Sequence, residues 1–227
     1  MPESQFRAVL WDLDGTIVDT HEMIYRCIAH TLRKHASIGY SQQDWHAHFG
    51  APLHIVFGHV YQGLGRPAPV GEELAGMVAT FREMQWQMLP DVALFGGVLE
   101  VIDAITEMGR LQGVVTTKHG ISAHRTLDHL ALAGRFDVVV CGDDCRNYKP
   151  HPEPFMTACS RLNLAPSECV VIGDSPADIT GAKAAGLHAV AATWGSASID
   201  ATLAAGPDSV APEPRQLFAL LGLGERN

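Results

Sequence analysis

Long apolar runs and an excess of positive charge are both missing from this sequence of 227 residues. The apolar runs are far shorter than the roughly 20 residues that cross a bilayer, and the first residues show no basic segment followed by an apolar one. Acidic residues outnumber basic ones by 25 to 16, a formal charge of −9, so the field of the protein repels phosphate backbones and anionic lipids. We therefore expect a cytoplasmic protein that binds neither nucleic acid nor membrane.

Paired cysteine motifs are absent from the sequence, and lysine is scarce. The five cysteines include no Cys-x-x-Cys pair, and the twelve histidines include no His-Glu-x-x-His arrangement, which argues against disulfides and against zinc. Only four lysines occur, at positions 34, 118, 149 and 183. The surroundings of each lysine are therefore informative in so acidic a chain.

Two kinds of periodicity divide the chain. Residues 6–13 form a short apolar run that stops at Asp-Gly-Thr, a pattern typical of a buried strand that ends in a turn. Residues 19–89 have helical periodicity, with Met77, Phe81 and Met84 on one helix face and a helix start at 41–44. This segment is predicted to be a compact, all-helical insert.

Helical and strand patterns alternate after this insert. We expect helices over residues 98–108, 121–132, 152–162 and 176–185, and strands over residues 111–116, 136–141, 169–173 and 188–192. The tail is predicted to add a short helix, an edge strand near residues 208–210 and a closing helix. Such alternation predicts a parallel sheet wrapped by helices.

Polar residues gather just beyond the ends of the predicted strands. In open parallel sheets, ligands bind in the crevice beyond the carboxyl ends of the strands. The residues expected to converge there are Asp12, Asp14, Thr116, Thr117, Lys118, Lys149, Asp174 and Asp178.

Carboxylates a few ångström apart repel each other by roughly 4 kcal/mol per pair at an effective dielectric constant near 20, so Asp12, Asp14 and Asp174 together require a cation. An all-oxygen set with few ligands favours Mg²⁺. One carboxylate of the Asp12/Asp14 pair could attack phosphorus while the other transfers protons. Gly15 allows a turn that brings backbone N–H groups near a phosphate, and Thr16 adds a hydroxyl group.

Four motifs in order resemble those of the haloacid dehalogenase-like hydrolase superfamily, over essentially the whole chain. Finer details resemble the branch of phosphoglycolate phosphatases with a helical cap. The motifs are Asp12-Leu13-Asp14-Gly15-Thr16, a strand ending in Thr116, Lys149-Pro150, and Gly173-Asp174-Ser175-Pro176-Ala177-Asp178.

The resemblance implies an α/β protein with a Rossmann-like, doubly wound parallel sheet as its core, formed by residues 1–17 and 90–227, and a helical cap over residues 18–89. It implies a hydrolase that uses Mg²⁺ and an aspartyl-phosphate intermediate. The implied roles are nucleophile for Asp12, acid and base for Asp14, phosphate binding for Thr116, Thr117, Lys149 and Gly15, and metal binding for Asp12, Asp174, the carbonyl oxygen of Asp14, and Asp178.

Several alternatives stay open at this stage. The leading substrate is 2-phosphoglycolate, although Thr117 stands where these relatives often have Asn. A pyrophosphatase or a phosphosugar mutase could use the same core, and His21 could serve the mutase as its proton carrier. A phospho-accepting receiver domain is the rival from another class.

Two residues have alternative roles. Asp178 could cap a helix instead of supporting a metal, and Lys118 could bind substrate or form an ion pair. The expected partner is a small phosphorylated metabolite, and the expected state is a monomer or homodimer.

Overall fold

The computed structural model describes residues 6–48 and 50–224. The chain divides into two compact units, one formed by Met1–Asp19 with Ala93–Asn227 and the other by Thr20–Val92. We call the first the sheet unit and the second the helical unit. The junctions predicted from the sequence, 17/18 and 89/90, lie two and three residues before those between these units.

The sheet unit is built on six parallel strands in the order β5-β4-β1-β6-β7-β8. The strand bounds are Ala8–Trp11 for β1, Leu111–Val115 for β4, Val138–Val140 for β5, Cys169–Gly173 for β6, His188–Ala192 for β7 and Ser209–Ala211 for β8. The predicted ranges for β6 and β7 are confirmed to the residue. The predicted edge strand of the tail is also present, since β8 lies at one end of the strand order.

Strand β1 lies between β4 and β6, and its four residues are all buried. Ala8 pairs with Leu111 on one side and with Cys169 on the other. The chain adds strands on one side of β1 before it crosses to the other side, so the carboxyl ends of β4, β1 and β6 lie next to one another at the reversal point. This arrangement brings their following loops together.

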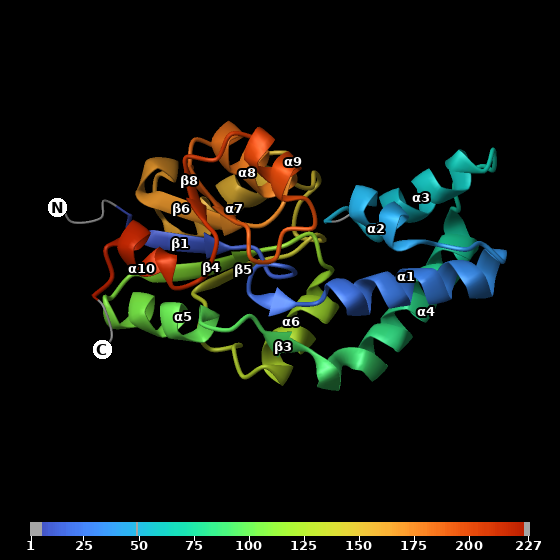
Figure 1. Ribbon diagram of the computed structural model, residues 1–227, viewed down its shortest axis with the longest axis horizontal. Helices are drawn as coiled ribbons and strands as arrows, with labels where there is room; N and C mark the ends of the chain where they lie inside the picture. Colours follow the sequence, from blue (N-terminus) through green and yellow to red (C-terminus); the bar gives the residue numbers. More distant parts are fainter. Residues whose placement is uncertain (1–5, 49, 225–227) are drawn as a thin grey trace. The chain divides into compact units, whose positions relative to one another are not determined.

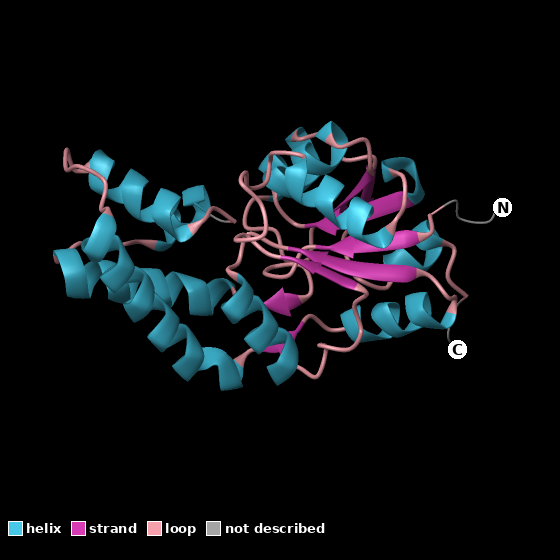
Figure 2. Cartoon of the chain, turned by 180° about the vertical axis from the view of Figure 1, so that it is seen from behind, coloured by secondary structure: helices cyan, strands magenta, loops and turns pink. Residues whose placement is uncertain are grey.

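Helices cover both faces of this sheet (Figures 1 and 2). On one face, Ala8 and Leu10 pack in a buried cluster with Phe155 of α7 and Ile179 of α8, because alternate residues of a strand point to the same side. The helix bounds are Val98–Glu107 for α5, Gly120–His129 for α6, Glu153–Leu162 for α7, Pro176–Ala184 for α8, Ile199–Ala204 for α9 and Gln216–Leu221 for α10, with a short 3₁₀ helix η2 over Pro166–Glu168. The doubly wound α/β fold is thus confirmed.

A small antiparallel pair of strands, β2 over Val18–Asp19 and β3 over Ala93–Leu94, was not predicted from the sequence. Val18 pairs with Leu94 and Asp19 with Ala93, at the two points where the chain leaves and re-enters the sheet unit. Two-residue strands are too short to show alternation, so local sequence carries no signal for this pair.

The helical unit contains α1 (His21–Ala36), α2 (Gln42–His48), α3 (Leu53–Gly63) and α4 (Gly71–Met88), followed by the 3₁₀ helix η1 (Leu89–Asp91). The expected apolar face of α4 is present, with Met77 and Phe81 buried. The predicted helix start before α2 is also confirmed, because Ser41 and Asp44 exchange side-chain and backbone hydrogen bonds of 2.6–3.2 Å. Within the described ranges, no helix combines the length and apolarity that a membrane crossing requires.

Candidate active site

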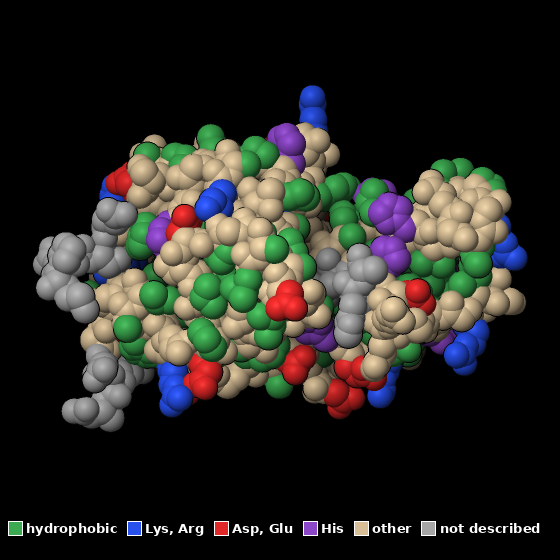
Figure 3. All heavy atoms as spheres, turned by 45° about the horizontal axis from the view of Figure 1, so that its top comes forward, with side chains coloured by type: hydrophobic (Ala, Val, Ile, Leu, Met, Phe, Trp, Pro, Cys, Tyr) green, Lys and Arg blue, Asp and Glu red, His purple; other side chains and the backbone are tan. Residues whose placement is uncertain are grey.

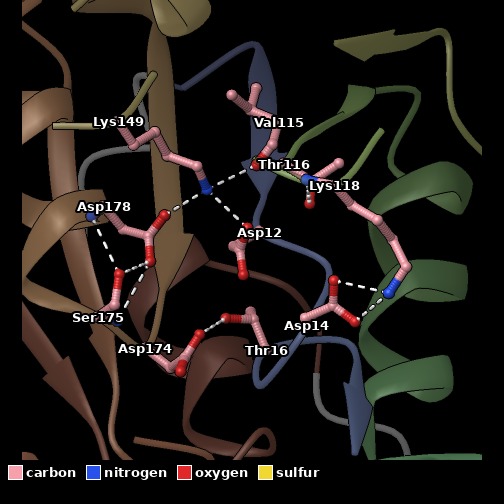
Figure 4. A network of polar contacts seen from close by, with 10 residues as sticks. All are labelled: Asp12, Asp14, Thr16, Val115, Thr116, Lys118, Lys149, Asp174, Ser175 and Asp178. Carbon is pink, nitrogen blue, oxygen red and sulfur yellow. Dashed lines mark hydrogen bonds and ion pairs between the residues drawn. The ribbon is translucent and has the colours of Figure 1, made fainter. Parts of the chain in front are cut away.

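Four of the predicted residues meet in one buried group at the carboxyl edge of the sheet (Figure 4). Asp12 directly follows β1, Asp174 directly follows β6, and Asp178 lies in the first turn of α8. Lys149 lies in the loop before α7. All four side chains are buried, so they form a buried cluster of charged groups at the carboxyl ends of the strands.

Lys149 connects this group. Its ammonium donates to Asp12 Oδ1 at 2.6 Å, to Asp178 Oδ1 at 2.5 Å and to the carbonyl oxygen of Val115 at 2.8 Å. An ammonium has three N–H donors, so these three acceptors use its full capacity. The ring of Phe155 lies below the ammonium, 5.8 Å from Nζ to the ring centre. Lys149 is therefore held in place between strands β1 and β4 and helix α8.

Asp178 has two structural tasks. While Oδ1 accepts from Lys149, Oδ2 accepts from the Ser175 hydroxyl at 2.6 Å and from the Ser175 N–H at 3.1 Å. The Ser175 hydroxyl in turn accepts from the Asp178 N–H, which completes a capping box at the start of α8. Both readings of Asp178 from the sequence, as helix cap and as part of the acidic site, are thus compatible with its position.

Asp174 is the least satisfied carboxylate of the group. Its Oδ1 accepts from the Thr16 hydroxyl at 2.8 Å. Its Oδ2 is buried and has no hydrogen-bond partner among the described residues. An unsatisfied buried acceptor is costly, so this oxygen is the carboxylate oxygen of the group that is most available to a ligand.

Burial and mutual repulsion act on the acidic groups together. Burial raises the pKa of Asp12 to about 7, with Lys149 opposing the shift and Asp178 adding to it. Burial, followed by repulsion from Asp12 and Asp178, raises the pKa of Asp174 well above its ordinary value. For Lys149, burial alone would lower the pKa, but the carboxylates of Asp12 and Asp178 outweigh it and raise the pKa. One lysine therefore does not balance three carboxylates.

These residues fit a divalent cation. Asp12, Asp174 and Asp178 each offer a carboxylate oxygen, and these oxygens lie within 4.8 Å of one another. Hard divalent cations prefer such oxygen ligands. Of the three residues, Asp174 fits best because its Oδ2 is unpartnered, whereas both oxygens of Asp178 already accept hydrogen bonds.

Asp14 lies apart from this cluster and binds a different lysine. Lys118 Nζ donates to Asp14 Oδ1 at 2.6 Å and to Oδ2 at 2.9 Å, and the two side chains are only 6% and 16% exposed. On a regular strand Asp12 and Asp14 would point the same way, but β1 ends at Trp11, so the alternation does not extend to Asp14. The two carboxylates therefore occupy different electrostatic surroundings.

Of the expected phosphate-binding residues, Lys149 contacts Asp12 directly, and the others lie in the loops that follow β4 and β1. Thr116 is buried, and its hydroxyl oxygen accepts from the Lys118 N–H at 3.2 Å, which leaves the hydroxyl proton to donate elsewhere. Thr117 is half-buried, and its carbonyl group faces Gly142 so closely that a Cβ there would overlap it. Gly15 has the positive φ, 91°, that its turn requires, but its own N–H donates to the Val18 carbonyl at 2.8 Å. The Gly15 N–H is therefore already used within its own loop.

Several supporting residues were missed by sequence reasoning. The Thr16 hydroxyl was expected to face an anion, yet it donates to Asp174. The Thr202 hydroxyl donates to the Asp174 carbonyl at 2.9 Å, and the Trp194 indole N–H donates to the Thr16 carbonyl at 3.0 Å. Only the Ser175-x-x-Asp178 spacing is a recognisable local signal. The other contacts join residues at least 28 positions apart and have no signature in the sequence.

Comparison with known proteins identifies the family of this chain. A profile of the family described as "Haloacid dehalogenase-like hydrolase" matches residues 9–192. A pyrophosphatase PpaX from Bacillus pumilus is 32% identical over 223 residues, which cover 98% of this chain and 99% of that protein.

Solved structures show the same fold. A protein described as a predicted phosphoglycolate phosphatase from Haemophilus somnus has a TM-score of 0.85 at 22% identity, covering 95% of this chain and 98% of its own. A β-phosphoglucomutase from Clostridium difficile also has a TM-score of 0.85, at 21% identity and 96% coverage of both chains. Together with the match over residues 9–192, the acidic group at the strand ends leads to one conclusion: the chain belongs to the haloacid dehalogenase-like hydrolases.

Proposed function

We propose that this protein is a Mg²⁺-dependent phosphatase that cleaves small phosphate compounds by transferring the phosphoryl group to Asp12. The observation that carries the proposal is the separation of the two aspartates that follow β1. Asp12 is held by Lys149 within the acidic cluster, whereas Asp14 is held by Lys118 outside it. Two carboxylates with different surroundings suit two different chemical roles.

In the first step, a carboxylate oxygen of Asp12 attacks phosphorus, and the bond from phosphorus to the leaving oxygen breaks. Asp14, which must carry a proton when the substrate is bound, donates it to that oxygen. In the second step, Asp14 takes a proton from a water molecule as the water attacks phosphorus. The phosphorus–Asp12 bond then breaks, which releases inorganic phosphate and restores both aspartates. In this proposal the Thr116 hydroxyl, whose proton is not used by the Lys118 N–H contact, binds a phosphoryl oxygen.

Lys149 prepares Asp12 for attack. Its fixed ammonium orients the Asp12 carboxylate and favours the ionised form against the effect of burial. Asp178 in turn fixes Lys149.

Asp12 and Asp174, with the main-chain carbonyl group of Asp14 and with Asp178 in support, would hold Mg²⁺. When bound, the ion supplies the positive charge that neutralises the cluster and the phosphoryl oxygens. Thr16 and Thr202 keep Asp174 in position for this role.

Two compounds are the leading candidates for the substrate. The curated relative that is 32% identical over nearly the whole chain is named a pyrophosphatase, which supports inorganic pyrophosphate. The motif resemblance supports 2-phosphoglycolate. The dispersed Lys and Arg side chains on the face shown in Figure 3 are consistent with a small substrate and not with a long polyanion.

For a mutase, His21 is the candidate proton carrier. It is the first residue of α1, and its ring is nearly perpendicular to that of Trp45, with the ring centroids 6.4 Å apart.

The test is phosphate release by purified protein with and without Mg²⁺, against pyrophosphate, 2-phosphoglycolate, hexose 1-phosphates and nucleoside monophosphates. We expect continuous turnover that a chelator abolishes. Isomerisation of a hexose 1-phosphate without phosphate release would indicate a mutase instead. A single stoichiometric phosphorylation without turnover would indicate a receiver and contradict the proposal.

A further inference from the structure

Lys118 is anchored beside the proposed site by its main chain. Its N–H donates to the Thr116 hydroxyl oxygen at 3.2 Å, and its carbonyl oxygen accepts from the Gly142 N–H at 2.9 Å. From this fixed base the side chain extends to Asp14, as Figure 4 shows. The ammonium therefore has a defined position beside the proposed acid and base.

The two lysines of the site differ in their remaining hydrogen-bonding capacity. The three N–H donors of Lys149 are all used by protein acceptors. Lys118 directs two contacts to the two oxygens of Asp14, and its third donor has no acceptor in the contacts found for residues 6–48 and 50–224. Lys118 can thus bind a further anion without giving up Asp14.

We infer that Lys118 binds an anionic group on the leaving part of the substrate and so selects substrates that carry a negative charge next to the scissile oxygen. This inference rests on the proposed function, in which Asp14 protonates the leaving oxygen. That oxygen must come within hydrogen-bond distance of Asp14, and Lys118 Nζ is 2.6 and 2.9 Å from the same carboxylate. The ammonium and the leaving oxygen therefore lie within about 6 Å of each other.

This distance decides the substrate class. In pyrophosphate the leaving oxygen is bonded directly to a second phosphoryl group, and in 2-phosphoglycolate a carboxylate lies one carbon away. Both place anionic oxygens within reach of Lys118. A protein with a net charge of −9 and a buried acidic cluster otherwise repels such groups. An ester with an uncharged leaving group gains nothing from Lys118.

A matched set of substrates separates this role from simple positioning of Asp14. The ester 2-hydroxyethyl phosphate resembles 2-phosphoglycolate in size and in its alkoxide leaving group, but has a hydroxymethyl group in place of the carboxylate. Steady-state kcat and KM are measured with Mg²⁺ for pyrophosphate, 2-phosphoglycolate and this ester, using the natural protein, Lys118→Met and Lys118→Arg. Thermal unfolding confirms that the variants are folded.

We expect Lys118→Met to reduce the ratio of kcat/KM for pyrophosphate to kcat/KM for 2-hydroxyethyl phosphate by about 100-fold, with a similar change for 2-phosphoglycolate. Lys118→Arg should restore most of the ratio, because it keeps the charge. An unchanged ratio, with all three substrates losing activity equally, would mean that Lys118 only positions Asp14 and would overturn the inference.

A binding measurement covers the case in which the neutral ester turns over too slowly to measure. Dissociation constants for the three compounds are determined by calorimetry with Asp12→Asn and with Asp12→Asn/Lys118→Met. Selective weakening for the two anionic compounds supports the inference, and equal affinities in both proteins contradict it. Absence of phosphate release from every substrate by the natural protein would instead remove the proposed function itself.

Discussion

Lys149 and Lys118 both bind an aspartate from the loop after β1, but the charges around them are balanced differently. Around Lys149, three buried carboxylates share one ammonium, and one carboxylate oxygen is left without a partner. Around Lys118, one ammonium faces one carboxylate in a two-point contact. The surroundings of Lys149, which we call the inner region, need an additional cation. The surroundings of Lys118, which we call the outer region, are already neutral and keep a donor for an anion. This difference would allow the same edge of the sheet to attract both a metal ion and an anionic substrate.

The largest expected effect is on the inner region. Asp12→Asn keeps the size of the side chain but removes the nucleophilic carboxylate, so turnover of pyrophosphate should fall about 10⁴-fold or more. Phosphate release measures the loss, and circular dichroism checks the fold. Turnover close to that of the natural protein would show that Asp12 is not the nucleophile.

Asp14→Asn should act through the outer region and cost less. Loss of a general acid and base reduces the rate by roughly 10²–10⁴-fold. The loss should shrink for p-nitrophenyl phosphate, whose leaving group needs little protonation, and this difference distinguishes proton transfer from misfolding. A uniform loss across leaving groups would argue against the assigned role.

Divalent cation should stabilise the inner region through Asp174. At a Mg²⁺ concentration about 100-fold above Kd, the gain is about 2.7 kcal/mol, which corresponds to a rise in Tm of roughly 5–10 °C for a chain of this size. Asp174→Asn should abolish this rise. Asp208→Asn is the control, because Asp208 pairs with Lys183 away from the cluster. An equal Mg²⁺ response in both variants would exclude Asp174 as a ligand.

The last expected effect is confined to the metal-free protein and is a pH dependence of its stability. Burial raises the pKa of Asp12 from 3.8 to about 7, so the folded state holds a proton that the unfolded state releases at lower pH. The contribution of Asp12 to the free energy of unfolding is therefore complete below about pH 4 and is lost as the pH rises towards 7. In urea titrations with chelator, Asp12→Asn should gain stability relative to the natural protein over this range. A constant difference would contradict the shift.

Much of the sheet unit could be predicted because its signals are local. The apolar runs of β6 and β7 end at turns that the sequence shows directly, and the polar residues at strand ends follow from the rule for parallel sheets. The capping box of Ser41 and Asp44 is likewise a pattern within four residues. The helical unit was predictable as helix, whereas any substrate-facing residues it contributes have no equivalent pattern.

The sequence by itself determined the α/β alternation, the helical insert and the group of residues at the strand ends, because periodicity and motif spacing depend on neighbouring residues. The tertiary structure alone decided which side chain binds which. Lys149 is 137 positions from Asp12, Lys118 is 104 from Asp14 and Thr16 is 158 from Asp174. Even the need for glycine at position 195, where a Cβ would overlap the Gly15 carbonyl oxygen, arises from such an approach. Contacts between distant segments exist only once the chain has folded, so no local pattern can encode them.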